Sequence, residues 1–407
     1  MGSICQIDAG ARQSLPRPLE SMATVLDPTS SQKRDWRLDF FRGLCLIIMT
    51  INHLPSMPLH RLTYETLGYI SSAEGFVLIS GITSGWVYGK AGVSSAKRIF
   101  RRCAYILLTY SLLVGVLFGL NTEISGVHPQ WRELVLALGG KPVPFAENTG
   151  ILLLYLLLFL LLPFVLREFE RGRAALLLCV SFGLWGLAQW RIGPSIGLGY
   201  VLAWQFLFIA GTWFGYARRR GIRVWGFLSP QMFKAIAAGF ALLLFLRHPM
   251  IVHPILNLGW WITSKEGVGI VRLVDIGFLA ILLANTTPAF GARLAKLAVC
   301  RAGCFLGQHS LQVFAWQVLV MGVSGMYSKT WADAGFGAQL MVTSAVVGSL
   351  FLAAWVHVVF RRICVFHVNP ITVIRHMPSR SPQSHDAARC RAMPRRSGNQ
   401  RLPAQAI

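Results

Sequence analysis

The chain has 407 residues, of which 54% are hydrophobic and 14% charged, and its formal net charge is +23 at neutral pH. Ordinary soluble domains carry about 25% charged residues, so this composition argues against a soluble protein and indicates a surface that faces lipid. The basic residues form short clusters between apolar runs and in the C-terminal tail. Without a basic domain or a recognised nucleic-acid motif, the charge does not indicate a nucleic-acid partner.

Ten apolar segments are suited to crossing a hydrocarbon core of about 30 Å. In chain order they cover residues 38–54, 72–89, 99–120, 150–166, 174–190, 200–216, 233–246, 268–283, 304–323 and 338–360. We therefore predict an all-α integral membrane protein, a polytopic bundle of about ten transmembrane helices.

Positive charge is concentrated in every second connection. Clusters precede the first segment and follow the second, fourth, sixth, eighth and tenth. Because loops rich in Lys and Arg stay cytoplasmic, both termini are predicted to be cytoplasmic. Residues 1–32 are predicted to be a disordered polar extension. Residues 367–407 are predicted to be a basic, disordered tail, which either touches membrane lipids or is an unconstrained extension. Residues 33–366 form the predicted membrane domain.

The cysteines and histidines indicate neither a disulfide framework nor a metal site. Eight cysteines are present, but no C-x-x-C pair occurs, and the histidines are scattered without a metal-binding spacing. A nucleophile elbow is also absent, because residues 81–85 read G-I-T-S-G.

Arg42 and His53 are the most informative pair in the first segment. They are eleven residues apart, which places them on nearly the same helix face, about 16 Å apart along the axis. Ionisable side chains inside hydrocarbon are costly and indicate a functional site. An imidazole can accept a proton from a hydroxyl, and a guanidinium can hold phosphate or carboxylate. The alternative is that Arg42 reaches the membrane surface and His53 ends a helix before Pro55.

Other polar residues are candidates for supporting roles. Asp39 lies three residues before Arg42 and can pair with it. Glu74 begins the second segment near the depth of His53, where it either orients the imidazole or lies at the membrane interface. Arg98 and Arg101 share a face at the start of the third segment and can bind phosphates, although the positive-inside rule also explains them. Gln205 either packs between helices or contacts substrate.

Three sequence blocks resemble the opening of the OpgC family. They are Arg-Leu-Asp-Phe-Phe-Arg-Gly at 37–43, His-Leu-Pro at 53–55 and Ala-Glu-Gly-Phe-Val-Leu-Ile-Ser-Gly at 73–81. That family comprises polytopic membrane acyltransferases related to the acyltransferase-3 superfamily. Its Arg-x10-His pair matches Arg42 and His53, and its Arg-x-x-Arg element matches Arg98 and Arg101. Weaker similarity at 202–206 and 306–311 extends the resemblance over about 34–360. Asn52 stands where the family often has an acidic residue, which puts a relay through that position in doubt.

The resemblance implies O-acyl transfer from cytoplasmic acyl-CoA to hydroxyls of a periplasmic glucan or another exported glycan, in a bacterial inner membrane. Acyl-CoA, either succinyl-CoA or acetyl-CoA with succinyl favoured, is then a co-substrate, and no bound cofactor is expected. His53 is the base or the acyl carrier, and Arg42, Arg98 and Arg101 contact the donor.

Two alternatives remain open. One is a transporter or flippase of a glycan or organic acid, with Arg42 and His53 as substrate and proton sites. The other is a membrane-bound O-acyltransferase of a different class, in which the Arg-x10-His spacing is accidental. The oligomeric state does not follow from the sequence.

Overall fold

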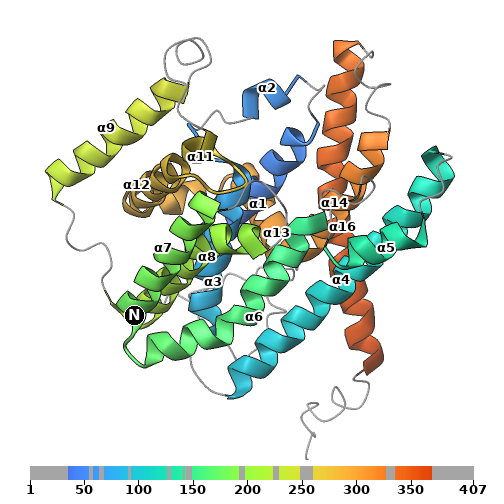
Figure 1. Ribbon diagram of the computed structural model, residues 1–407. Helices are drawn as coiled ribbons and strands as arrows, with labels where there is room; N and C mark the ends of the chain where they lie inside the picture. The colour runs from blue at the N-terminus through green and yellow to red at the C-terminus, as the bar shows by residue number, and fades with distance from the viewer. Residues whose placement is uncertain are drawn as a thin grey trace, which may run out of the picture. The chain divides into compact units, whose positions relative to one another are not determined.

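The computed structural model describes residues 35–54, 58–63, 68–89, 93–125, 130–140, 143, 149–191, 198–222, 229–247, 260–326 and 335–368. Within these residues the regular structure is helical, which confirms the predicted all-α class (Figure 1). The helices are α1 Trp36–Asn52, α2 His60–Thr63, α3 Ser72–Tyr88, α4 Val93–Ser125, α5 Trp131–Leu138, α6 Gly150–Glu170, α7 Ala174–Arg191, α8 Leu198–Arg219, α9 Pro230–Arg247, α11 Trp260–Thr263, α12 Ile270–Leu294, α13 Ala298–Gln308, α14 Ser310–Met326 and α16 Phe336–Val368.

Every predicted apolar segment falls on a helix, with one correction. The ninth segment, 304–323, is divided at His309, where α13 ends and α14 begins. The His309 backbone N–H bonds to the Leu306 carbonyl at 3.1 Å, three residues back instead of four. This tighter turn interrupts the helical ladder, so two shorter helices replace the single one that was predicted.

In the described part of the chain, four helices are long and apolar enough to cross a membrane. They include residues Ser95–Asn121 of α4, Gly150–Glu170 of α6, Pro230–Arg247 of α9 and Phe336–Ile363 of α16. Helices α1 and α3 have 17 residues each, a length of about 25 Å. The prediction of about ten spans with cytoplasmic termini therefore stays a prediction.

The chain divides into two compact units, 1–357 and 358–407. Of the second unit, the structure describes only the last turns of α16, through Val368. The predicted extension 1–32 lies outside the described residues, as does the predicted tail from residue 369 onward. All contacts discussed below belong to the first unit.

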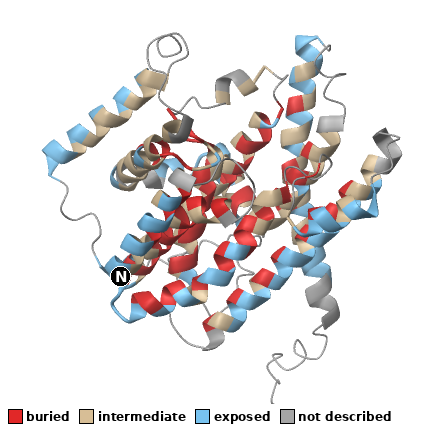
Figure 2. Cartoon of the chain, viewed as in Figure 1, coloured by how far each residue is buried: buried red, intermediate tan, exposed pale blue. Residues whose placement is uncertain are grey.

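Glycine allows the closest helix packing in the first unit. A methyl group at Gly85 of α3 would overlap the carbonyl of Thr212 in α8, and one at Gly215 of α8 would overlap the carbonyl of Ile82. Two backbones that approach this closely leave no room for side chains. Figure 2 shows the buried residues gathered on the inner helices, whereas α9 has none.

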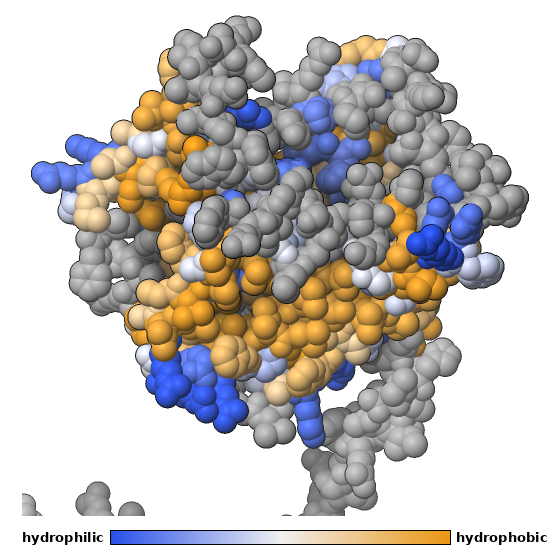
Figure 3. Space-filling model, viewed as in Figure 1, coloured by the Kyte–Doolittle hydropathy of each residue, from blue (hydrophilic) through white to orange (hydrophobic). Residues whose placement is uncertain are grey.

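Apolar side chains also cover much of the outside. Exposed examples on α4 and α6 are Leu108, Leu112, Leu160 and Phe164. Figure 3 shows a broad apolar surface on this face, with hydrophilic groups beside it. An exposed apolar area of this kind indicates contact with lipid or with another protein, and the four long apolar helices favour lipid.

Candidate active site

Asp35 fixes the start of α1. Its carboxylate accepts the Arg37 backbone N–H at 3.1 Å, capping the helix, and pairs with the guanidinium of Arg37 at 2.9 Å and that of Arg218 at 3.0 Å. Burial alone would raise the pKa of Asp35, but the hydrogen bonds and charge of Arg37, together with the charge of Arg218, lower it below its usual value. The start of α1 is thereby tied to the end of α8.

Arg42 connects α1 to α3. Its Nη2 donates to Thr83 Oγ1 at 2.5 Å and lies 3.5 Å from the Ile79 carbonyl. The side chain is half-buried and reaches across to the neighbouring helix. This geometry argues against the alternative in which Arg42 merely extends to the membrane surface. Asp39, one turn earlier, is buried where α1 meets Gly307 of α13.

His53 ends α1 with one ring nitrogen already engaged. Nδ1 lies 2.7 Å from the Met49 carbonyl, and a carbonyl oxygen can only accept, so Nδ1 carries the proton. Nε2 therefore keeps its lone pair, and the side chain is exposed. Beside it, Asn52 Oδ1 accepts the hydroxyl of Thr63 at 2.7 Å, which ties α2 to the end of α1. The arrangement leaves a nitrogen that can accept a proton or attack a carbonyl carbon.

Glu74 is fully buried, and its partners are not those predicted. Its Oε2 accepts the backbone N–H of Ser71 at 2.6 Å and also the Ser71 hydroxyl, forming the cap of α3. Its Oε1 lies 3.3 Å from Nη1 of Arg272. Among the described residues, the carboxylate therefore pairs with Ser71 and Arg272, and His53 is oriented by Met49 instead.

Arg272 and Asp275 of α12 were not singled out from the sequence. Arg272 is 4% exposed and donates to the carbonyls of Thr263 at 2.6 Å and Tyr69 at 2.5 Å. Asp275 is fully buried and accepts the Tyr69 backbone N–H at 2.7 Å. An Arg and an Asp three residues apart within the eighth apolar segment meet the criterion that selected Arg42 and His53. A search of every apolar segment for ionisable residues would therefore have found Arg272 and Asp275.

Arg98 belongs to a cluster of cations and aromatic rings at the other end of α1. Its guanidinium lies over the Tyr88 ring at 5.5 Å and donates to Ser95. Arg101 is exposed on the following turn of α4. Three cations at the end of α8 complete the cluster: Arg218 over Trp86, Arg219 donating to the Trp86 carbonyl, and Arg220, just after the helix, over Tyr216. This cluster and His53 are separated by the length of α1, about 25 Å.

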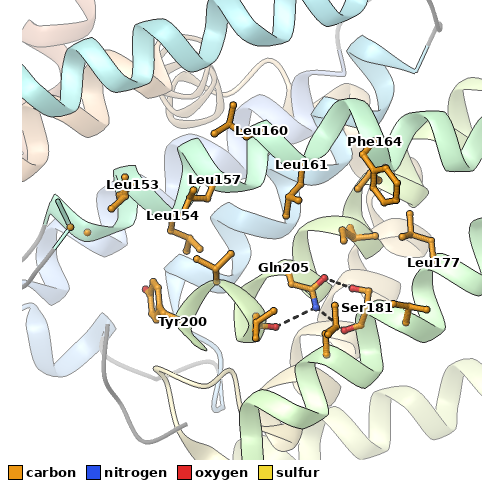
Figure 4. A pocket seen from close by; sticks show the side chains of 18 of the residues that line it. Leu153, Leu154, Leu157, Leu160, Leu161, Phe164, Leu177, Ser181, Tyr200 and Gln205 are labelled. Carbon is orange, nitrogen blue, oxygen red and sulfur yellow. Dashed lines mark hydrogen bonds between the residues drawn. The ribbon is translucent and has the colours of Figure 1, made fainter. Parts of the chain in front are cut away.

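Gln205 joins α7 to α8. Ser181 Oγ donates to Gln205 Oε1 at 2.5 Å, and Gln205 Nε2 donates to the Ser181 carbonyl at 2.7 Å. Figure 4 shows this pair in the wall of a cavity of about 690 Å³ between α6, α7 and α8. Its other walls are mostly apolar, with several leucines, and they include Tyr200. Neither Arg42 and His53 of α1 nor Glu74 of α3 lines this cavity.

In the described part of the chain, no group of three or more His, Cys, Asp or Glu side chains is placed to hold a metal ion. The polar residues above include the exposed imidazole of His53 at the end of α1, the buried Glu74–Arg272 pair, and a basic cluster at the opposite end of α1. Four helices are long and apolar enough to cross a membrane, and Glu74, Arg272 and Asp275 are buried between helices. Together these features indicate a membrane protein with a polar site in its interior.

The comparison with protein families identifies which membrane protein family this is. The family model described as OpgC protein matches residues 34–130 and 134–362. The chain therefore belongs to the OpgC family, as its sequence blocks predicted. A comparison with curated proteins finds no match, and neither does a comparison with solved structures. Membership indicates a membrane-associated, acyltransferase-like role.

Proposed function

We propose that this protein is an O-acyltransferase that moves an acyl group, with succinyl favoured, from cytoplasmic acyl-CoA to hydroxyls of a periplasmic glucan or another exported glycan. It does so as a protein of about ten spans with cytoplasmic termini, in a bacterial inner membrane, and it resembles the acyltransferase-3 superfamily in its Arg-x10-His pair. Membership of the OpgC family supports the reaction class.

The observation that carries the proposal is the tautomer of His53. With Nδ1–H held by Met49, Nε2 takes the proton of the acceptor hydroxyl while its oxygen attacks the thioester carbonyl. The tetrahedral intermediate then expels the coenzyme A thiolate, which receives that proton. As the alternative role, the same Nε2 carries the acyl group transiently.

The donor binds along α1. Arg98 and Arg101 hold the phosphates of coenzyme A in the basic cluster, and planar guanidinium groups suit phosphate oxygens. Arg42 lies between this cluster and His53 and steers the acyl-bearing arm. Because the two sets are about 25 Å apart, the donor enters from the cytoplasmic side and the acceptor meets it at the opposite side.

The test places the acyl donor and the glycan acceptor on opposite sides of the membrane. Inverted vesicles containing the protein are prepared with periplasmic glucan inside, and labelled succinyl-CoA or acetyl-CoA is added outside. The proposal predicts base-labile label on the enclosed glucan, and none when the same vesicles lack the protein. Label that accumulates inside without forming an ester would support the transporter alternative instead.

A further inference from the structure

The cavity between α6, α7 and α8 has no part in the proposed reaction. Its volume of about 690 Å³ is within the range of about 300–1,000 Å³ that is usual for small-molecule sites. Of the described residues that line it, none is charged, and Ser181, Tyr200 and Gln205 are the ones with polar side chains. The cavity is therefore large enough for a ligand, and its walls suit an apolar one.

Two of the three polar side chains already have partners within the wall. Gln205 Oε1 accepts the Ser181 hydroxyl at 2.5 Å, and Gln205 Nε2 donates to the carbonyls of Ser181 at 2.7 Å and Leu202 at 3.3 Å. Both hydrogens of the amide are thus used inside the protein. Apolar cavities hold water poorly, because water needs two to four polar partners. Hydrocarbon is the ligand that this part of the wall accepts at least cost.

The cavity is open on the outer side of α6 and α7. Six side chains of these two helices both line it and are exposed: Leu157, Leu160, Leu161, Phe164, Val180 and Leu184. Helix α6 is one of the helices that are long and apolar enough to cross a membrane. Because the opening lies along such a helix, the molecules that reach it from outside are the hydrocarbon chains of membrane lipids.

The cavity also has the length of one lipid chain. Its wall on α6 extends from Leu153 to Val165, which corresponds to about 18 Å along the helix axis. Each leaflet contributes half of a hydrocarbon core of about 30 Å, or about 15 Å. An extended acyl chain of one leaflet therefore fits along α6.

Tyr200 lies at one end of this cavity. Figure 4 shows it beside Leu153 and Leu154, at the end opposite Phe164 and Leu177. Its ring packs on Trp204 at 5.5 Å, and in the described part of the chain its hydroxyl has no hydrogen-bond partner. A tyrosine with an apolar body and a polar tip suits the depth at which lipid chains meet their ester groups.

We propose that the cavity between α6, α7 and α8 binds one acyl chain of a membrane glycerophospholipid. The ester carbonyl of that chain accepts the hydroxyl of Tyr200, and its methyl end lies near Phe164. The lipid belongs to the leaflet on the predicted periplasmic side, where α6 and α8 begin. Because three helices enclose the chain, it exchanges more slowly than the lipid around the protein. The site requires nothing of the acyl-transfer reaction.

Native mass spectrometry tests whether a lipid is retained. The full chain is reconstituted in vesicles of phosphatidylethanolamine and phosphatidylglycerol with a little polyprenyl phosphate, and is then transferred to a mild detergent. One phospholipid should remain on each native chain. Loss of all lipid would overturn the inference, and so would retention of polyprenyl phosphate in place of phospholipid.

A variant that fills the cavity should lose this lipid. Val180→Trp places a larger side chain in the wall formed by α7 and should weaken retention about 5- to 150-fold, from the usual cost of overpacking. The matched control is Leu187→Trp, because Leu187 is on the same helix and 53% exposed against 50% for Val180, but does not line the cavity. It should retain lipid as the native chain does. Equal retention by the two variants would overturn the inference.

Tyr200→Phe tests the polar end without altering the packing. Loss of one hydrogen bond should weaken retention about 2- to 13-fold. Unchanged retention would overturn the placement of the ester group beside Tyr200.

Photo-cross-linking in vesicles locates the chain without detergent. A phospholipid with a diazirine near the methyl end of one acyl chain should label the α6 peptide that contains Phe164. Val180→Trp should remove this label and leave the label on Leu108 and Leu112 of α4, which are exposed and report ordinary contact with the bilayer. If labelling of α6 persisted in Val180→Trp at the level seen on α4, the contact would be ordinary bilayer contact and the inference would be overturned.

Discussion

Replacing Arg272 by methionine removes the guanidinium from a site where both partners are inaccessible to water. Glu74 is 0% exposed and Arg272 4% exposed. Taking one partner from a buried ion pair costs about 3–5 kcal/mol, because the other charge is left buried and uncompensated. The carbonyls of Tyr69 and Thr263 lose their donor as well. We therefore expect Arg272→Met to lower the free energy of unfolding by at least this amount.

The assay is reversible unfolding in mixed micelles by titration with a denaturing detergent. Arg293→Met serves as the matched control, since Arg293 is exposed on the same helix and should change stability by less than about 0.5 kcal/mol. The double variant Glu74→Gln/Arg272→Met should lose less than the sum of the single variants, with a coupling of about 0.5–3 kcal/mol. If Arg272→Met were as stable as the Arg293 control, the reasoning about this buried pair would be refuted.

Three further predictions concern packing, donor binding and pH. Gly85→Val should destabilise the protein by about 1–3 kcal/mol, because the added carbons meet the α8 backbone. The control Gly119→Val, at a site with open space, should leave stability unchanged. Equal unfolding curves for the two variants would contradict the close packing of α3 against α8. Arg42→Lys should raise KM for acyl-CoA about 10- to 150-fold, because losing a charge-assisted hydrogen bond costs about 1.5–3 kcal/mol. An unchanged KM in initial-rate measurements would remove Arg42 from the donor site. Because the pKa of Asp35 is lowered in the folded protein, its stabilisation is present above its unfolded pKa of about 3.9 and is lost as pH falls through the folded value. Thermal unfolding at pH 6 and pH 3 should therefore differ less for Asp35→Asn than for the native chain, and equal differences would contradict this role.

Hydropathy was sufficient to locate the helices, because apolar runs of 14 to 23 residues leave few alternatives to helical structure in lipid. The division at His309 was not predictable in the same way. Residues 306–311 contain no proline, and the close approach of Gly307 to the backbone of Asp39 in α1 is a tertiary contact. Local sequence therefore gave the correct helical content but missed a boundary that depends on packing.

The candidate site shows the same difference between what local sequence predicts and what depends on tertiary contacts. Arg42 and His53 are on one helix, so their spacing alone predicted a shared face. The partner of Glu74 is 198 residues away in the chain, and no local pattern connects the two. Similar expected depth was therefore a poor guide to the partner of Glu74, which the structure pairs with Arg272. The basic cluster shows the same effect, since Arg98 and the α8 cations meet only in the folded chain.

The most direct test of the account is the rate of ester formation by the native chain and by His53→Ala in the glucan-loaded inverted vesicles. Loss of the proton acceptor should reduce transfer by at least about 10²–10⁴-fold, while the amount of folded protein, measured by size-exclusion chromatography, stays the same. Ester formation by His53→Ala at a rate close to that of the native chain would contradict the central claim that Nε2 of His53 carries out the chemistry.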